Sequence, residues 1–244
     1  MMMKIRKVRD LTLVSLGNGQ ELVIACDSCG GIGLKPGDTL QVAPAVTGKF
    51  TARVVILEVM CTGAKVICLT NAVCNEMEPT GRELLTGVNE ELKAAGIDSI
   101  ALTGSTEENF PTVSTAVGIT AIGIVDHTTI RVNTCKKDAW VIAVGMPKVG
   151  QEVLTGELPG YGLIRELLEC PGVYEIVPVG SKGILYEARE LARNNQLSLT
   201  LNQKINVDIA KSAGPCTTML VAAGEDALEK LNGLSQAEVI GRLI

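Results

Sequence analysis

The stretch Leu22-Val-Ile-Ala-Cys-Asp-Ser-Cys-Gly-Gly-Ile-Gly33 carries an apolar strand into an aspartate and a group of three glycines. Glycine lets the backbone approach a ligand closely, and a carboxylate such as Asp27 can hold a cation. We therefore predict that the strand ends in a turn suited to a metal-bound phosphate, with Gly30 and Gly31 beside it. A second acidic turn, Leu102-Thr-Gly-Ser-Thr-Glu-Glu-Asn-Phe-Pro111, also follows an apolar strand, so the two turns need a joint explanation.

The composition narrows the class of protein. The chain has 244 residues, of which 46% are hydrophobic, so it can bury the core of one large domain or of two ordinary ones. Aromatic residues make up 2% and the net charge is −5, which argues against a nucleic-acid partner. The sequence shows neither an apolar run long enough to span a bilayer nor a secretory signal. We expect a cytoplasmic enzyme that binds neither nucleic acid nor a membrane.

Periodicity and turn residues predict a mixture of strands and helices, which makes the fold α/β or α+β. Gly17-Asn-Gly-Gln20 predicts a β-hairpin, and Thr80-Gly-Arg-Glu83 and Ser235-Gln-Ala-Glu238 read as capping boxes that open helices. A polar stretch predicts a domain boundary, with one domain at 1–130 and a compact one at 131–244. Further strands are expected at 66–70, 99–102, 119–125, 140–144, 175–179 and 217–222, and helices at 50–61, 161–168, 182–194 and 227–231.

The chain has eight cysteines, two of which form the CxxC motif Cys26-Asp-Ser-Cys29. That spacing suits a redox pair or half of a zinc site. However, the sequence has no second CxxC, and its single histidine is His127. We expect reduced thiols that pack in the core.

Glu58 lies in an apolar segment that is expected to be a buried helix, Arg53-Val-Val-Ile-Leu-Glu-Val-Met-Cys-Thr-Gly-Ala64. A buried carboxylate is costly unless it is paired or bound to a cation. One reading is an ion pair with Arg53 or Lys65. The other is a Mg²⁺ ion shared with Asp27.

Taken in order, these motifs resemble the aminoimidazole ribonucleotide synthetase superfamily, which includes thiamine monophosphate kinase. The resemblance rests on Asp27 with its glycines, on Glu58 five residues before Gly63-Ala64, and on the turn Thr103-Gly-Ser-Thr106. In the second half, Val179-Gly-Ser-Lys-Gly-Ile184 and the segment from Lys211 to Leu220 look like the Gly-rich turns of the family.

The resemblance implies an ATP enzyme of two domains, in which the N-terminal sheets of two subunits form a dimer β-barrel. ATP would lie against that barrel, with its phosphates on Mg²⁺ ions. By position, Asp27 and Glu58 match metal-binding carboxylates. Thr103, Gly104, Ser105 and Thr106 match the third turn, which would contact the nucleotide.

The third turn departs from the family pattern, because Ser105 stands where an acidic residue is usual. Glu107 or Glu108 would then complete the metal shell or accept the hydroxyl proton. Lys182 sits at a predicted helix start, where it would bind an anion or remain a solvated surface lysine.

Two segments look closest in sequence to the short α-ribazole kinases of cobalamin salvage: Met77-Glu-Pro-Thr-Gly81 and the stretch from Thr103 to Pro111. Such a kinase would phosphorylate the 5′-hydroxyl of α-ribazole. Two alternatives remain open. One is an ATP-driven cyclase or dehydratase of the same superfamily, and the other is a nucleotide-binding regulatory protein without turnover.

Overall fold

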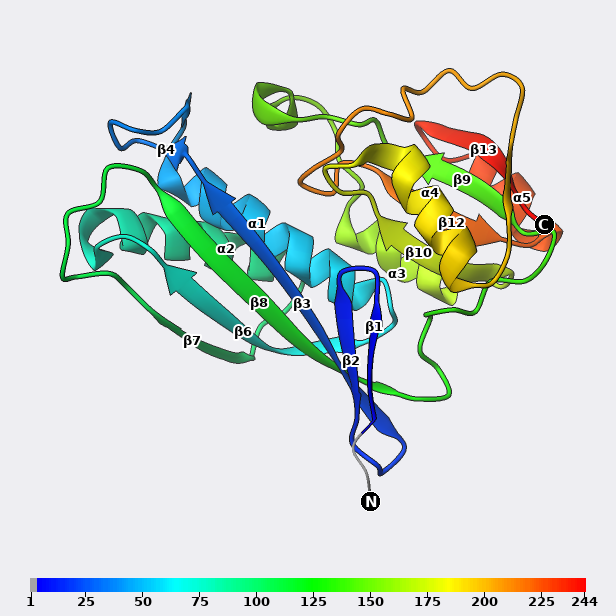
Figure 1. The fold of residues 1–244 in the computed structure, drawn as a ribbon, viewed down its shortest axis with the longest axis horizontal. Helices are drawn as coiled ribbons and strands as arrows, with labels where there is room; N and C mark the ends of the chain where they lie inside the picture. Colours follow the sequence, from blue (N-terminus) through cyan, green and yellow to red (C-terminus); the bar gives the residue numbers. More distant parts are fainter. Residues whose placement is uncertain (1–3) are drawn as a thin grey trace. The chain divides into compact units, whose positions relative to one another are not determined.

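The computed structural model describes residues 4–244, and the chain divides into two compact units (Figure 1). The first unit contains the residues up to Met60 together with Ala64–Thr128, and the second contains Cys61–Gly63 and Thr129–Ile244. No helix among residues 4–244 is both long and apolar enough to cross a lipid bilayer.

The N-terminal unit is built on a six-stranded sheet in the order β1-β2-β3-β8-β6-β7. Neighbouring strands are antiparallel, except that β6 and β7 are parallel. The predicted hairpin is confirmed as β2 and β3. The strands are β1 (Ile5–Val8), β2 (Leu11–Ser15), β3 (Gln20–Gly30), β6 (Lys65–Val73), β7 (Ala101–Ser105) and β8 (Ala116–Asp126), and β4 (Ile32–Gly33) and β5 (Leu40–Gln41) form a separate small pair.

The long ladder between β3 and β8 is continuous from the pair Gln20–Asp126 to the pair Gly30–Ala116. Successive side chains in a strand point to opposite faces, so the ladder separates two sets of residues. In β8 the buried set includes Val117, Ile119 and Ala121, and the residues between them are only half buried. The ladder therefore presents one fully covered face and one partly open face within this unit.

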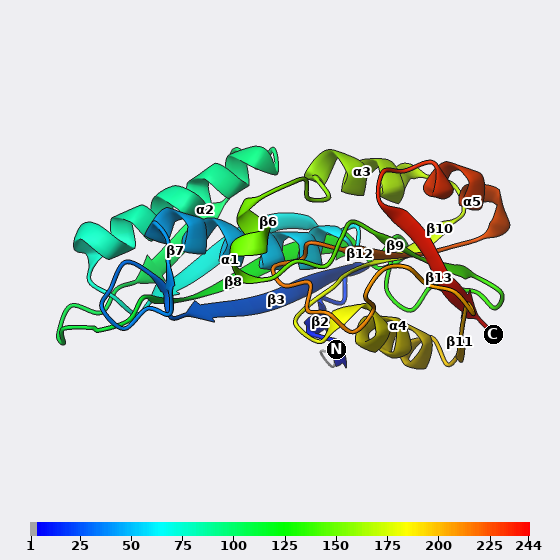
Figure 2. The same cartoon turned by 90° about the horizontal axis from the view of Figure 1, so that it is seen from above.

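Two helices, α1 (Pro44–Met60) and α2 (Arg82–Ala94), lie over one face of this sheet (Figure 2). Glycines allow their close contact. A Cβ at Gly48 would meet the backbone of Leu84, and a Cβ at Gly87 would meet the backbone of Ala45. α1 also approaches β8 closely, where a Cβ at Gly123 would meet the side chain of Val59. A larger residue at Gly48 or Gly87 would push the two helices apart, and one at Gly123 would push α1 off the sheet.

The C-terminal unit has a five-stranded antiparallel sheet in the order β10-β12-β9-β13-β11. Helix α4 covers one face, and α3 and α5 cover the other (Figure 2). Because both faces are covered, the inner strand β12, between β10 and β9, is buried along its whole length. The strands are β9 (Trp140–Val144), β10 (Val173–Pro178), β11 (Leu199–Leu201), β12 (Met219–Ala223) and β13 (Ala237–Leu243), and the helices are α3 (Tyr161–Glu169), α4 (Gly183–Asn194) and α5 (Glu225–Asn232).

Both predicted capping boxes are wrong. Thr80 donates its hydroxyl to Glu76 Oε1 in a short helical turn, Met77–Gly81, that precedes α2. The second box lies at the start of a strand, β13, instead of a helix. There the Glu238 carboxylate accepts the backbone N–H groups of Asn206 and Val207 from a neighbouring loop. In both cases a partner outside the four-residue pattern bonds the expected capping side chain: Glu76, four residues before Thr80, and for Glu238 a loop distant in the chain.

Two of the predicted turns are strands. Asp27 does not follow its strand but lies inside β3, because pairing with β8 continues through Gly30. Thr103, Gly104 and Ser105 lie on the edge strand β7 instead of in a turn. The segment that leaves the sheet begins at Thr106.

Candidate functional site

Asp27 lies on the face of β3 that α1 covers, between Ala25 and Cys29. It is half buried. Burial raises the pKa of the Asp27 carboxyl, the Ser28 backbone N–H opposes that shift, and the negative charge of Asp10 adds to it. A carboxylate in this position gains from a cation that would offset both burial and the neighbouring charge.

Glu58 lies in the last turn of α1, and its side chain is 12% exposed. Glu58 Oε2 lies 3.7 Å from Nη2 of Arg9, whose own side chain is 6% exposed. The sequence had pointed to Arg53 or Lys65 as the ion-pair partner. In the structure Arg53 Nη1 lies 3.6 Å from Glu91 Oε1, and the partner that approaches Glu58 comes from the start of the chain.

The turn between β1 and β2 connects the two predicted metal-binding carboxylates. Its two residues are Arg9, which has a left-handed backbone with φ of 52°, and Asp10. Arg9 approaches Glu58, and the charge of Asp10 acts on Asp27. Arg9 and Asp10 were not predicted as site residues, because nothing in the local sequence distinguishes them from an ordinary hairpin turn.

The turn thus brings a guanidinium to Glu58 and a carboxylate to Asp27, and the four residues together carry more negative than positive charge. Oxygen ligands of this kind suit Mg²⁺, which usually takes one or two carboxylates and completes its shell with water and phosphate. Among residues 4–244, no three His, Cys, Asp or Glu side chains are grouped to hold a metal ion by themselves. The residues therefore fit a Mg²⁺ ion that arrives with a phosphate, and they do not fit an all-protein metal cage.

The backbone of the glycines after Asp27 makes hydrogen bonds within the protein. Gly30 closes the ladder against Ala116, and Gly31 has a positive φ of 76°. The N–H of Gly31 donates to Thr115 O, and its carbonyl accepts from Thr39 N. The conformational freedom of Gly31 thus serves the sharp exit from β3, and its N–H is directed at the protein.

Hydrogen bonds to its own acidic residues hold the predicted third turn in place. Glu108 Oε1 accepts from Met77 N at 2.9 Å and from Thr106 Oγ1 at 2.7 Å. Glu107 Oε1 accepts from Asn109 N at 2.7 Å, and its own N–H donates to Asn75 O. The Glu108 carboxylate joins two segments of the unit, whereas the Glu107 carboxylate bonds only within its own loop.

A polar network that the sequence analysis did not find holds the loops around these residues. Asn75 is fully buried, and its side chain donates to Thr112 Oγ1 and Ser114 O. Lys35 Nζ lies 2.7 Å from Glu76 Oε2. Although burial opposes the shift, hydrogen bonds from Lys35 and Thr80 lower the pKa of Glu76 to about 2.

Asp38 anchors the other side of the same network. Its Oδ1 accepts from Ser114 Oγ and Thr115 N, and its Oδ2 accepts from Thr115 Oγ1 and Lys35 N. Burial raises the pKa of Asp38, but the Thr115, Ser114 and Lys35 hydrogen bonds outweigh it and leave the pKa below its ordinary value. Asp38 and Glu76 thus hold the loops on either side of Thr106 to Glu108.

Lys182 belongs to the C-terminal unit, where it occupies the position before α4. Lys182 Nζ lies 3.1 Å from the Tyr186 hydroxyl and 4.2 Å from the centre of its ring. The Gly-rich turn that contains Lys182 meets the later one, because Ala213 N donates to Gly180 O. The structure therefore joins the two Gly-rich turns that the motifs had suggested in this half.

The CxxC motif is not arranged as a redox pair. None of the eight cysteines, all of which lie among the described residues, forms a disulfide. Cys26 and Cys29 lie three residues apart in β3, so their side chains point to opposite faces about 10 Å apart along the strand. Cys26 and Cys74 are exposed, so the prediction that the thiols fill the core fails for these two.

Residues 9–125 match the family model "AIR synthase related protein, N-terminal domain". A comparison with curated protein sequences finds no match. Among solved structures, thiamine-monophosphate kinase from Stenotrophomonas maltophilia K279a superposes with a TM-score of 0.67 at 17% identity, over 98% of this chain and 88% of that one. The complex of AaThiL with AMPPCP and TMP gives 0.67 at 13%, over 96% and 84%. The E. coli hydrogenase maturation protein HypE gives 0.66 at 14%, over 91% and 80%.

At these identities the structural likeness shows the fold. It confirms the predicted mixed α/β fold of the aminoimidazole ribonucleotide synthetase type. The family match over residues 9–125 supports the superfamily that the motifs resemble. The dimer β-barrel stays a prediction.

The Glu76 network predicts how the stability of the fold depends on pH. Glu76 has a folded-state pKa of about 2 against an ordinary value of 4.5. A depressed pKa means that the charged form stabilises the fold above pH 4.5, and this contribution is lost as pH falls from about 4.5 towards about 2. Urea unfolding across this range should show stability falling with pH, and the fall should be shallower in Glu76→Gln.

The matched control is Glu90→Gln, which changes an exposed glutamate on α2. It should reproduce the wild-type pH dependence. An unchanged slope in Glu76→Gln would contradict the assignment of this network as the source of the lowered pKa.

Proposed function

We propose that this chain is a cytoplasmic, ATP-dependent kinase of the aminoimidazole ribonucleotide synthetase superfamily, which transfers the γ-phosphoryl group to the 5′-hydroxyl of α-ribazole. The observation that carries the proposal is an AIR synthase-related domain over residues 9–125 with Asp27 and Glu58 at the two metal-binding positions that the motifs imply. The fold shared with thiamine-monophosphate kinase supports a phosphotransferase. The choice of α-ribazole as the acceptor rests on the sequences of the segment Met77–Gly81 and of the stretch from Thr103 to Pro111.

Phosphoryl transfer mainly requires that the reactants be positioned and that the charge of the phosphates be neutralised. Mg²⁺ would supply the positive charge that offsets the phosphates. Asp27 on β3 and Glu58 on α1 are carried by rigid elements, so they would hold that ion at a fixed place. Arg9 would keep part of the charge of Glu58 balanced, because the two side chains already lie 3.7 Å apart at their charged atoms.

Glu107 is the better candidate to replace the acidic residue missing at Ser105. Its carboxylate bonds only to Asn109 N within the same loop, whereas Glu108 links Thr106 to Met77. A short change in the loop would turn Glu107 towards a phosphate or an acceptor hydroxyl. Glu108 would instead keep the loop in place for Thr106, whose hydroxyl and backbone would contact the nucleotide.

In the C-terminal unit, Lys182 would bind an anionic group of the acceptor or the nucleotide. It stands at the start of a helix, where free N–H groups also favour negative charge. The later Gly-rich turn at Gly214 adjoins this helix start, so backbone from two turns is available there.

A homodimer would explain the open face of the N-terminal sheet. Helices α1 and α2 lie over one face (Figure 2), and the half-buried residues of the other face include Leu22, Ile24, Ile122 and Ile124. These side chains come from the neighbouring strands β3 and β8. Two such faces packed together would bury them and give the predicted dimer β-barrel.

The reaction is tested with the full chain, ATP and Mg²⁺ against a panel of α-ribazole, thiamine phosphate and common nucleosides. Mass spectrometry should find α-ribazole phosphate as the product. Release of inorganic phosphate with a dehydrated or cyclised product would favour the cyclase alternative. Binding of ATP without its consumption, for every acceptor, would favour a regulatory protein.

The metal-binding role predicts that Asp27→Asn and Glu58→Gln each lower turnover by about 100-fold or more, since each removes charge that balances the transferred phosphoryl group. Both proteins should fold, as judged by circular dichroism. Glu90→Gln, which removes an exposed carboxylate from α2, should keep wild-type turnover. Wild-type activity in Asp27→Asn or in Glu58→Gln would remove that residue from the site.

The loop geometry predicts unequal effects at the two adjacent glutamates. Glutamine keeps an acceptor oxygen, so Glu108→Gln should retain the bonds to Met77 N and Thr106 Oγ1 and most of the turnover. Glu107→Gln removes charge from the carboxylate proposed to face the substrate, so kcat should fall by about 100-fold. If neither variant changes kcat, this loop is not part of the active site.

A further inference from the structure

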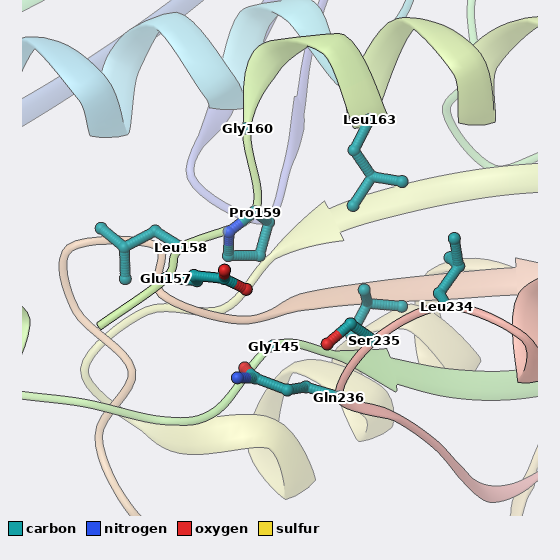
Figure 3. Close-up of a pocket in the computed structure, with 10 residues that line it drawn as sticks. Gly145, Glu157, Leu158, Pro159, Gly160, Leu163, Leu234, Ser235 and Gln236 are labelled. Carbon is teal, nitrogen blue, oxygen red and sulfur yellow. The ribbon is translucent and has the colours of Figure 1, made fainter.

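We propose that the C-terminal unit carries a second small-molecule site, which binds a small organic cation with an apolar body. The site is a cavity of about 230 Å³ that is open to solvent and is formed by residues of this unit alone (Figure 3). A dry cavity of about 150 Å³ is known to hold benzene. The cavity therefore has room for a six-membered ring with one short substituent.

The walls of the cavity are mainly aliphatic. Leu158 and Leu163 come from one segment, at the start of α3, and Leu234 comes from the segment before β13 (Figure 3). Gly145 closes the cavity where β9 ends, and it packs so tightly that a Cβ there would lie 2.8 Å from Pro159 Cγ. A ligand that enters would exchange water contacts for contacts with these apolar side chains, which favours an apolar body.

Three polar residues of the same segments lie at the open edge of the cavity. Glu157, Ser235 and Gln236 line the cavity (Figure 3) and are also exposed to solvent. Within the described part of the chain, none of these side chains makes a hydrogen bond or an ion pair with another residue. Glu157 is the one charged side chain among the residues that line the cavity, so a ligand with a cationic donor group complements it best.

The segments that carry these side chains are held before any ligand binds. Gly145 N donates to Gln236 O at 3.0 Å, which joins the end of β9 to the residue before β13. Lys148 Nζ donates to Thr155 O at 2.8 Å and to Glu157 O at 3.3 Å, which fixes the loop that precedes α3. The ammonium group of Lys148 thus bonds the backbone of this loop, and the Glu157 carboxylate is left at the open edge of the cavity.

The charge assignment is tested on the full chain with benzamidine, benzamide and benzoate, which have nearly the same shape and differ in charge. Affinities are measured by NMR titration. Benzamidine should bind more tightly than benzamide, and benzoate should bind least. Glu157→Gln should weaken benzamidine by about threefold to tenfold and leave benzamide unchanged. Equal affinities for the three probes, or no effect of Glu157→Gln on benzamidine, would overturn the proposal of a cation site.

The location is tested with two glycine variants of the same α3 segment. A Cβ at either Gly160 or Gly162 meets no atom within 4 Å, so both Gly160→Leu and Gly162→Leu should fold. Gly160 lines the cavity and Gly162 does not. Gly160→Leu should weaken benzamidine by about tenfold or more by filling the space, while Gly162→Leu should bind as the wild type does. Equal binding by the two variants, or no binding by the wild type at about 10 mM benzamidine, would exclude this cavity as the site.

Discussion

The continuous pairing of β3 with β8 is the constraint on which the N-terminal unit depends. Because the two strands stay in register from Gln20–Asp126 to Gly30–Ala116, every side chain of β3 has an assigned face. A slip of one residue would turn Asp27 away from α1 and bring Cys26 into the covered face. The ladder thus places the carboxylate beside the helix that carries Glu58, and it also makes the glycines after Asp27 an exit from the sheet.

The charges of the candidate site come from segments that are far apart in the chain and adjacent in the fold. The β1–β2 turn supplies Arg9 and Asp10, β3 supplies Asp27, and α1 supplies Glu58. Arg9 pairs with Glu58, Asp10 acts on Asp27, and among residues 4–244 no three ligands are gathered in one place. This arrangement suits a cation that brings its own phosphate and water ligands.

Acidic residues serve two different roles in this unit. Asp38, Glu76 and Glu108 accept hydrogen bonds that join separate loops, and these bonds explain why the pKa values of Asp38 and Glu76 lie below their ordinary values. The Glu107 carboxylate bonds only within its own loop. The same kind of side chain therefore fastens the structure at one position and remains available for chemistry at the next. In the C-terminal unit, Glu157 is also available, because Lys148 holds its loop through backbone oxygens.

The sequence by itself determined the mixed α/β class, the β2–β3 hairpin, most helices and strands, and the resemblance that led to Asp27 and Glu58. These features are local, because they follow from the spacing of apolar residues and from turn residues within one segment. Only the tertiary structure decided that Asp27 lies inside a strand, that Ser235 to Glu238 opens a strand, and that Arg9 meets Glu58. Each of these outcomes depends on a partner distant in the chain: β8 for Asp27, the Asn206 loop for Glu238, and the first hairpin for Glu58. A local pattern cannot contain such a partner, since long-range pairing is set by how whole elements pack.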